Sequence, residues 1–335
     1  MTNRAIIEDI FSHNNQIISY VKTVEDNFYI NYYYNYLDYK SINKLKLILK
    51  TIAVRLDTRV DYTFADDCLV VMVAKKQNET LYFDNYLGWI PRNKDYVFLG
   101  VNQQGDSIYE KVQDIKSLLI GGSSGSGKSN LLHQLILSYL FLNDHNYIMI
   151  IDMKANEFTR YSDKIFGNRL VLPVAYTYEK AFETIVAFRN IIKNRFEEMM
   201  KKEQRFSSEP PVLLVIDEYA QLFQDNEQKK KINSLISQCA SLGRASNCYL
   251  FLATQHPTNE NITNTIRANM QSRIVLKCMN TQQSHNLLGT PEATTLQHAG
   301  DSIIHIDGKK PIKAKTTYVS DEVLNDATKK GKIYC

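Results

Sequence analysis

The sequence has no apolar run long enough to cross a bilayer, and no apolar signal-peptide segment follows its first residues. Its most apolar stretch, residues 131–142, is short and is interrupted by His133, Gln134 and Ser138. With 44% hydrophobic and 23% charged residues, the composition also excludes the disordered and collagen-like classes. We therefore expect a soluble globular protein that needs a partner for any work at a membrane.

Cysteine is scarce and irregularly spaced. The five cysteines show no C-x-x-C pair and no Cys/His ligand spacing, so neither a disulfide framework nor a zinc site is expected. Several lie in apolar segments, where cysteine behaves as a small buried hydrophobe, and the reduced cytoplasm is the natural compartment. The formal net charge of +4 is compatible with a nucleic-acid partner, but a mildly basic solvated surface explains it with fewer assumptions.

A chain of 335 residues is longer than one average domain, and its pattern changes near residue 110. Residues 1–110 predict a small α+β domain with a helix over 42–56 and strands over 68–73 and 80–83, separated by a polar turn at 75–79. Residues 29–39 are rich in tyrosine. These side chains could stack nucleic-acid bases, but packing in a half-buried sheet is the favoured interpretation.

From residue 111 to about 320 the pattern alternates between strand, loop and helix. The strands are nearly continuous apolar runs, which is typical of a sheet covered on both faces, and the intervening helices imply parallel βαβ units. We therefore predict a mostly parallel, doubly wound α/β domain, followed by a C-terminal tail at 321–335. The expected strands are 117–120, 147–151, 212–216, 248–253, 273–277 and 302–306, and the expected helices are 128–142, 179–204 and 229–242.

The strongest motif fits the pattern G-x-x-x-x-G-K-[ST] and lies between a predicted strand and a predicted helix. Glycines allow the backbone N–H groups to turn inward toward phosphate oxygens, and the helix N-terminus adds its dipole. Lys128 is expected to reach the β- and γ-phosphates of ATP, and the Ser129 hydroxyl to bind Mg²⁺. The predicted nucleotide-binding residues are Gly122, Ser123, Ser124, Gly125, Ser126, Gly127, Lys128, Ser129 and Asn130.

A second motif is the apolar strand at 212–216, which ends in two adjacent carboxylates, Asp217 and Glu218. Such a strand end is weak on its own, because many strands exit into acidic turns. Downstream of a phosphate-binding loop, it places Asp217 beside Mg²⁺ and leaves Glu218 to activate water. A base in that position favours hydrolysis over simple nucleotide holding.

Two further residues are candidates for catalysis. Gln255 follows the apolar strand at 248–253 and could sense the γ-phosphate or orient water, although a polar residue that simply begins a loop is the alternative. Arg244 follows a predicted helix and could act as an arginine finger across a subunit boundary, or it could satisfy the carbonyls at the helix end. Arg267 and Arg273 are rival candidates for the finger.

Over residues 42–320 the chain resembles the FtsK/SpoIIIE-type DNA-translocating motors of the FtsK–HerA superfamily. Order and spacing of several motifs agree together, and no single motif carries the resemblance. The matching segments are 118–129 (LLIGGSSGSGKS), 151–154 (IDMK), 215–220 (VIDEYA), 242–245 (LGRA), 252–257 (LATQHP), 264–269 (NTIRAN), 272–274 (SRI), 287–289 (LLG) and 300–301 (GD).

The resemblance implies a RecA-like P-loop ATPase core and a homohexameric ring that uses ATP and Mg²⁺ to pump double-stranded DNA. It also implies that Arg244 is the trans-acting finger and that Asp152 and Lys154 lie near the nucleotide. The chain shows neither the membrane region nor the winged-helix module of chromosome-segregating members, so we expect plasmid, conjugative or phage DNA transfer. A membrane-associated or relaxase-type protein is then an expected partner. The alternatives are a secretion-type ATPase that handles protein and an ATP-gated DNA-binding switch.

Overall fold

A computed structural model describes residues 2–26, 28–36, 42–75, 80–88, 91–92, 94–161 and 169–330. The chain forms two compact units. One comprises Met1–Glu79 with Gln103–Gly105, and the other comprises Thr80–Asn102 with Asp106–Cys335. The predicted boundary near residue 110 falls inside the second unit, because the strands at 96–102 and 107–111 belong to its sheet.

The N-terminal unit is a four-stranded antiparallel sheet in the order β1-β2-β4-β3, with two helices packed against it. The second helix has the predicted bounds, since its apolar residues recur every three or four positions and form one buried stripe. The elements are α1 (Asn3–His13), β1 (Ile18–Glu25), β2 (Tyr29–Tyr36), α2 (Ile42–Leu56), β3 (Val60–Ala65) and β4 (Cys68–Ala74).

The tyrosine-rich segment mainly serves packing. Tyr32, Tyr34 and Tyr36 alternate along β2 toward the helices and are buried in the core of this unit. Tyr33 lies on the other face, where the Lys22 ammonium is 4.6 Å from its ring centroid. The end of the segment, residues 37–39, lies outside the described residues, as do residues 76–79 of the predicted turn.

In the second unit, the described residues form a nine-stranded sheet in the order β6-β5-β13-β12-β11-β7-β10-β9-β8. The predicted parallel sheet is confirmed for the last five strands of this order, which pair in parallel. The first four strands extend it by antiparallel pairing. The bounds are β5 (Tyr96–Asn102), β6 (Ser107–Lys111), β7 (Ser117–Gly121), β8 (Tyr147–Asp152), β9 (Val212–Asp217), β10 (Cys248–Thr254), β11 (Ser272–Leu276), β12 (Asp301–His305) and β13 (Ile312–Lys315).

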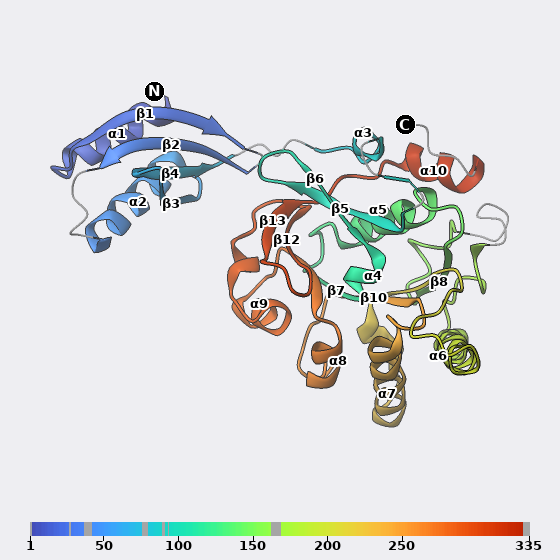
Figure 1. The fold of residues 1–335 in the computed structure, drawn as a ribbon. Coiled ribbons are helices and arrows are strands. Elements are labelled where there is room, and N and C mark those ends of the chain that lie inside the picture. Colours follow the sequence, from blue (N-terminus) through green and yellow to red (C-terminus); the bar gives the residue numbers. More distant parts are fainter. Residues whose placement is uncertain are drawn as a thin grey trace. The chain divides into compact units, whose positions relative to one another are not determined.

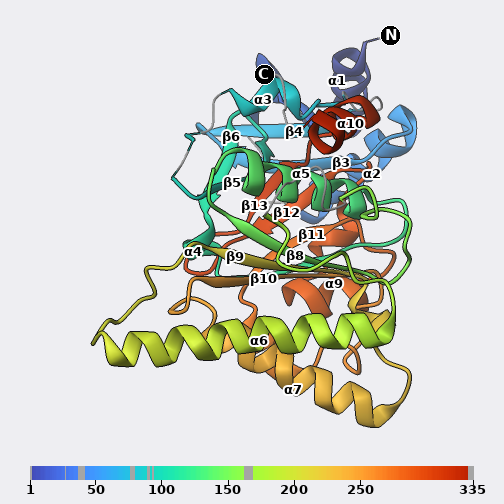
Figure 2. The same cartoon turned by 90° about the vertical axis from the view of Figure 1, so that its right-hand side faces the viewer.

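Helices cover both faces of this sheet (Figures 1 and 2). Successive residues of β7 point to opposite cores: Leu118 and Ile120 pack with α5, whereas Leu119 packs with α6 and α7. The apolar runs seen in the sequence thus follow from burial on both faces. The helices are α3 (Asp84–Leu87), α4 (Val112–Ile115), α5 (Lys128–Phe141), α6 (Tyr178–Lys201), η2 (Tyr219–Leu222), α7 (Asn226–Leu242), α8 (Asn264–Asn269), α9 (Thr281–Leu288), η3 (Glu292–Thr295) and α10 (Asp321–Lys330).

Two sequence predictions differ from the structure at the edges of this unit. The strand predicted at 80–83 is wrong, because Tyr82 makes only an isolated bridge to Tyr318 before the chain turns into α3. The predicted tail contains α10, whose Leu324 and Ala327 are buried in the core shared with α5. This part of the tail therefore belongs to the folded unit.

Cysteine burial agrees with the sequence interpretation. Cys68, Cys239, Cys248 and Cys278 are free and buried. Burial raises the pKa of Cys239 to about 12 and that of Cys278 to about 11, so both thiols stay protonated at neutral pH. No helix in the described part of the chain combines the length and the apolar composition needed to span a bilayer.

Candidate nucleotide site

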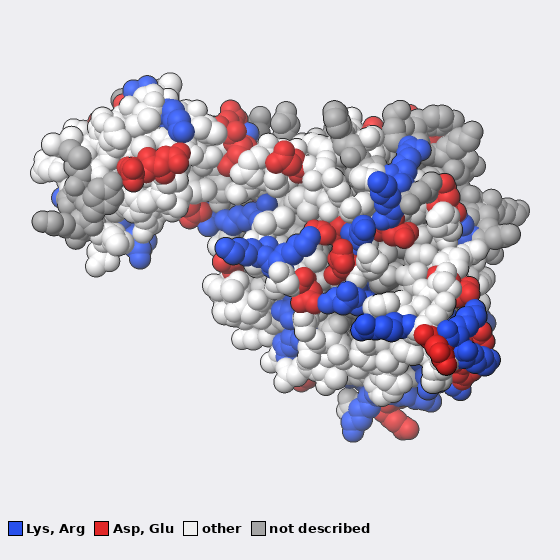
Figure 3. Space-filling view, viewed as in Figure 1, with Lys and Arg blue, Asp and Glu red and all other residues white. Residues whose placement is uncertain are grey.

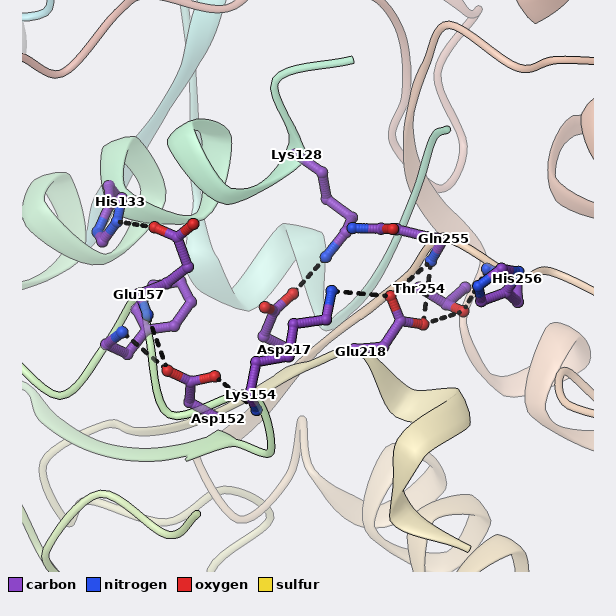
Figure 4. Close-up of polar contacts among 11 residues, drawn as sticks. Lys128, His133, Asp152, Lys154, Glu157, Asp217, Glu218, Thr254, Gln255 and His256 are labelled. Atoms are coloured by element: carbon purple, nitrogen blue, oxygen red, sulfur yellow. Dashed lines mark hydrogen bonds and ion pairs between the residues drawn. The ribbon is translucent and has the colours of Figure 1, made fainter. Parts of the chain in front are cut away.

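The predicted site residues other than Arg244 meet where parallel strands end. The loop after β7, Asp152 at the end of β8, Asp217 at the end of β9 and Thr254 at the end of β10 all lie at the carboxyl edge of the sheet. This edge is where open α/β sheets bind ligands. Figure 4 shows the side chains from these separate strand ends around one centre.

The glycine-rich loop has the backbone that its sequence predicts. Gly125 and Gly127 have φ of +75° and +96°, a region in which other residues are strained. Gly127 also lies against the chain at Gly300, whose N would be 3.1 Å from a Cβ at position 127. The loop is anchored by Ser123, whose N–H and hydroxyl both donate to the Lys277 carbonyl at 2.9 Å. The helix α5 then starts at Lys128 with no side-chain cap, which leaves its N-terminus suited to an anion.

Lys128 and Asp217 form a buried ion pair at the centre of the site. Their side chains are only 2% and 1% exposed. In the part of the chain that the structure describes, the other carboxylate oxygen, Asp217 Oδ2, is buried without a hydrogen-bond partner, and so is Ser126 Oγ. Buried polar atoms without partners are rare and costly, so these two mark where a ligand belongs.

These observations fit Mg²⁺ and ATP. A carboxylate oxygen and the hydroxyl of Ser129, the residue after Lys128 in α5, are ligands that Mg²⁺ accepts, and Lys128 can transfer from Asp217 to a phosphate. Asp217 and Ser129 would hold the metal, while Lys128 and the loop N–H groups would hold the phosphates. Asn130 is less available, because its side chain donates to the Thr317 carbonyl at 2.6 Å and accepts from the Val319 N–H at 3.0 Å.

The Glu218 carboxylate is held from two sides. Its side chain is 2% exposed and its backbone has a φ of +55°. The Thr254 hydroxyl donates to Oε1 at 3.1 Å, and the Gln255 N–H lies 3.2 Å from each oxygen. On the other side, Lys154 Nζ is 3.7 Å from Oε2. The structure thus brings Glu218 and Gln255 together through the Gln255 main chain.

Thr254 and Lys154 are therefore part of the arrangement around Glu218. Sequence reasoning did not assign Thr254, although a hydroxyl at the end of a buried apolar strand was a usable signal. Lys154 was expected near the nucleotide from the resemblance alone. Its place beside Glu218 depends on contact between two strand ends that lie far apart in the sequence.

Asp152 organises the loop that follows β8. Its Oδ1 accepts from the Lys154 N–H at 3.1 Å, and its Oδ2 accepts from the N–H groups of Glu157 and Phe158 at 3.1 and 2.9 Å. The same loop contacts α5, where His133 Nε2 lies 3.6 Å from Glu157 Oε2 (Figure 4). This contact with His133 lowers the pKa of Glu157. Asp152 thereby fixes the loop that carries Lys154.

Arg244 lies away from this centre, in the loop that precedes β10 and so at the amino edge of the parallel strands. It lines a surface cavity of about 260 Å³ together with Ser117 and Ser272, which begin β7 and β11. Its side chain is exposed, and no hydrogen bond or ion pair joins it to another described side chain.

The other two candidate arginines, Arg267 and Arg273, form hydrogen bonds within their own unit. Arg267 donates to Asn259 Oδ1 at 2.9 Å and to Asn264 Oδ1 at 2.6 Å. Arg273 donates to the Leu287 carbonyl at 2.6 Å, and burial lowers its pKa. Of the three arginines, Arg244 is the one that is free to reach another molecule.

The fold and this site define a P-loop ATPase. The model of the FtsK/SpoIIIE family matches residues 91–209. Curated relatives include the DNA translocase FtsK of Clostridium tetani, 28% identical over 69% of this chain. That of Staphylococcus aureus strain Mu50 is 29% identical over 70% of it. The chain spans about a third of the length of these relatives, 33% and 32% respectively.

Solved structures share the fold. The pCW3 conjugation coupling protein TcpA, in a monomer form with ATPγS, superposes with a TM-score of 0.69 and 18% identity, over 98% of this chain and 99% of that one. The type VII secretion ATPase EccC of Thermomonospora curvata gives a TM-score of 0.57 and 19% identity, over 69% of this chain and 29% of that one. At these identities the likeness concerns the fold, and it matches the predicted RecA-like class.

Proposed function

We propose that this protein is an ATP-driven translocase of double-stranded DNA that works as a homohexamer in plasmid, conjugative or phage DNA transfer. The observation that carries the proposal is the position of Glu218: a buried carboxylate, fixed by Thr254 and Gln255, one residue from the Asp217–Lys128 pair. This is the arrangement needed to orient water for hydrolysis beside a bound phosphate. A protein that only held the nucleotide would have little use for it.

The residues divide the work of hydrolysis. Lys128 and the loop amides would bind the phosphates, Ser129 and Asp217 would hold Mg²⁺, and Glu218 would take the proton of the attacking water. Mg²⁺, when bound, supplies charge neutralisation at the phosphates. Gln255 is proposed to orient the water or sense the γ-phosphate, and Arg244 to complete the site of a neighbouring subunit.

Support for DNA as the substrate comes from the relatives. The curated relatives are DNA translocases, and a conjugation coupling protein shares the fold over almost its whole length. The charge on the visible face is not a guide, because basic and acidic side chains are interspersed there (Figure 3). We place the protein in the cytoplasm, with a membrane-associated or relaxase-type partner that recruits it to a transfer site.

The test is the steady-state ATPase rate without nucleic acid, with long duplex DNA and with single-stranded DNA, at about 50 and about 200 mM salt. We expect duplex DNA to stimulate turnover and salt to weaken the stimulation, because phosphate contacts release counterions. Lys128→Ala should abolish turnover. Glu218→Gln should keep ATP binding and lower turnover by orders of magnitude. Unchanged turnover in Lys128→Ala would refute the assignment of the phosphate-binding loop.

A secretion-type ATPase that handles protein is the second candidate, because EccC shares the fold. Turnover that responds to no nucleic acid would favour it. An ATP-gated DNA-binding switch is the third candidate, and it predicts ATP-dependent DNA binding without movement along the duplex.

A further inference from the structure

Lys154 and Lys128 each pair with a carboxylate of the site. Lys128 pairs with Asp217, and Lys154 lies 3.7 Å from Glu218, the next residue along the chain. In each pair the carboxylate neutralises a lysine ammonium. Both ammonium groups are cations that the phosphates of a nucleotide would attract. When a phosphate binds, Lys128 is expected to leave Asp217 for the phosphate, as the lysine of any phosphate-binding loop would. The loop motif does not explain the Lys154–Glu218 pair.

The backbone of the loop that carries Lys154 is fixed by hydrogen bonds, whereas the Lys154 side chain has few contacts. The Asp152 carboxylate binds three loop N–H groups, including that of Lys154, and Ala155 is held at a φ of +53°. The Lys154 side chain, by contrast, is 30% exposed and contacts Glu218 at ion-pair distance only. A lysine stem has four carbons and a compact charge, so it can change partners without moving the loop.

The pair also restricts what Glu218 can do. The Thr254 hydroxyl donates to Oε1, the Gln255 N–H lies 3.2 Å from each oxygen, and the Lys154 ammonium faces Oε2 at 3.7 Å. While that contact persists, the Lys154 ammonium lies beside Oε2 and restricts the approach of water to that side of the carboxylate. Moving Lys154 away from Glu218 opens this side of the carboxylate to water, and the γ-phosphate is an anion that would attract the lysine.

We propose that Lys154 exchanges Glu218 for the terminal phosphate of ATP, so that the base is released only when a triphosphate is bound. The proposal rests on the nucleotide site described above and adds a γ-phosphate-binding role for this residue. ADP lacks the terminal phosphate, and it leaves the Lys154–Glu218 pair closed. Hydrolysis then restores the pair and returns the site to its resting state.

A double-mutant cycle on nucleotide affinity tests this without measuring turnover. The variants are Lys154→Met, Glu218→Gln and the double variant, and the probes are ATPγS and ADP with Mg²⁺, titrated by calorimetry. Glu218→Gln should tighten ATPγS binding, because the ligand no longer has to break an ion pair. Lys154→Met should weaken ATPγS binding by about tenfold, the value of one charge-assisted hydrogen bond. ADP affinity should change little in either variant.

The decisive result is the double variant. If Lys154 is shared between Glu218 and the phosphate, Glu218→Gln tightens ATPγS binding only while Lys154 is present, and it has no effect in the Lys154→Met background. Equal tightening in both backgrounds, or an unchanged ATPγS-to-ADP ratio in Lys154→Met, would overturn the proposal. Lys154→Arg is the matched control, since it retains the charge and should keep most of the ATPγS preference. A wild-type protein that binds neither nucleotide would overturn the proposed function as well.

Discussion

Asp152 and Asp217 are register partners on the adjacent parallel strands β8 and β9, and both carboxylates are buried, but they have opposite hydrogen-bonding environments. Both oxygens of Asp152 accept loop N–H groups, whereas Asp217 Oδ2 has no hydrogen-bond partner in the described part of the chain. Two neighbouring acids thus divide between structure and ligand binding. Their paired positions at the ends of adjacent strands make them a matched pair for mutation.

Asp217→Asn should remove the Mg²⁺-dependent part of ATPγS binding, because an amide is a poorer Mg²⁺ ligand and cannot balance Lys128. Asp152→Asn should instead lower the free energy of unfolding by about 1–3 kcal/mol, since the amide nitrogen cannot accept the loop N–H groups. The measurements are ATPγS titrations with Mg²⁺ and with chelator, together with urea unfolding. Loss of Mg²⁺ dependence in Asp152→Asn, with Asp217→Asn unaffected, would reverse the assignment.

Gly127→Ala should impair both stability and nucleotide binding. A side chain at a φ of +96° costs about 1–2 kcal/mol, and its Cβ would lie 3.1 Å from the Gly300 nitrogen. The displacement would move the first turn of α5, where the phosphates are expected to bind. Urea unfolding and ATPγS affinity are the measurements.

Gly308→Ala is the control for Gly127→Ala. Gly308 has a φ of +78° with no atom within 4 Å of a built Cβ, and it lies in the turn between β12 and β13. We expect a loss of stability from strain and unchanged ATPγS affinity. Equal effects of the two variants on affinity would contradict a specific role for Gly127.

Gln134 links three segments that are distant in the sequence. Its Oε1 accepts from the N–H and the hydroxyl of Thr317 at 2.7 and 2.8 Å, and its Nε2 donates to the Phe98 carbonyl at 3.1 Å. Gln134→Leu should destabilise the unit by roughly 2–5 kcal/mol, because each buried group left unsatisfied costs about 1–3 kcal/mol. Thr317→Val removes only the hydroxyl and should cost less. Denaturant unfolding with an unchanged m-value would check both.

The parallel half of the sheet and the core of the site could be predicted because their signals are local. Apolar runs identify β7 to β10, and the glycine spacing identifies the loop that ends at Ser129. The antiparallel half could not be predicted in this way. It depends on β13 pairing with β5, as in Ala314 opposite Asn102, and two segments so far apart leave no periodic signal in the sequence.

The same limit applies to the environment of Glu218. The sequence indicates that Glu218 is an acid at a strand end. The residues that contact its carboxylate are Thr254, at the end of β10, and Lys154, in the loop after β8. Strand order alone brings these residues together. The position of Arg244 at the amino edge is likewise a consequence of chain direction in parallel strands. This position leads to a prediction about which copy of the chain Arg244 can act on.

An arginine at the amino edge cannot complete the nucleotide site at the carboxyl edge of its own sheet, since the strands β7 and β10 separate the two. If Arg244 is a finger, it must act on another copy of the chain. Arg244→Ala should therefore abolish turnover alone and should regain part of it when mixed with Lys128→Ala, because mixed rings contain interfaces with an intact loop and an intact arginine. Arg273→Ala provides the contrast: its guanidinium is bonded to the Leu287 carbonyl, so the variant should lose stability and should gain no activity on mixing. The measurement is ATPase rate against mixing ratio at fixed total protein, and absence of rescue at every ratio would rule out action in trans.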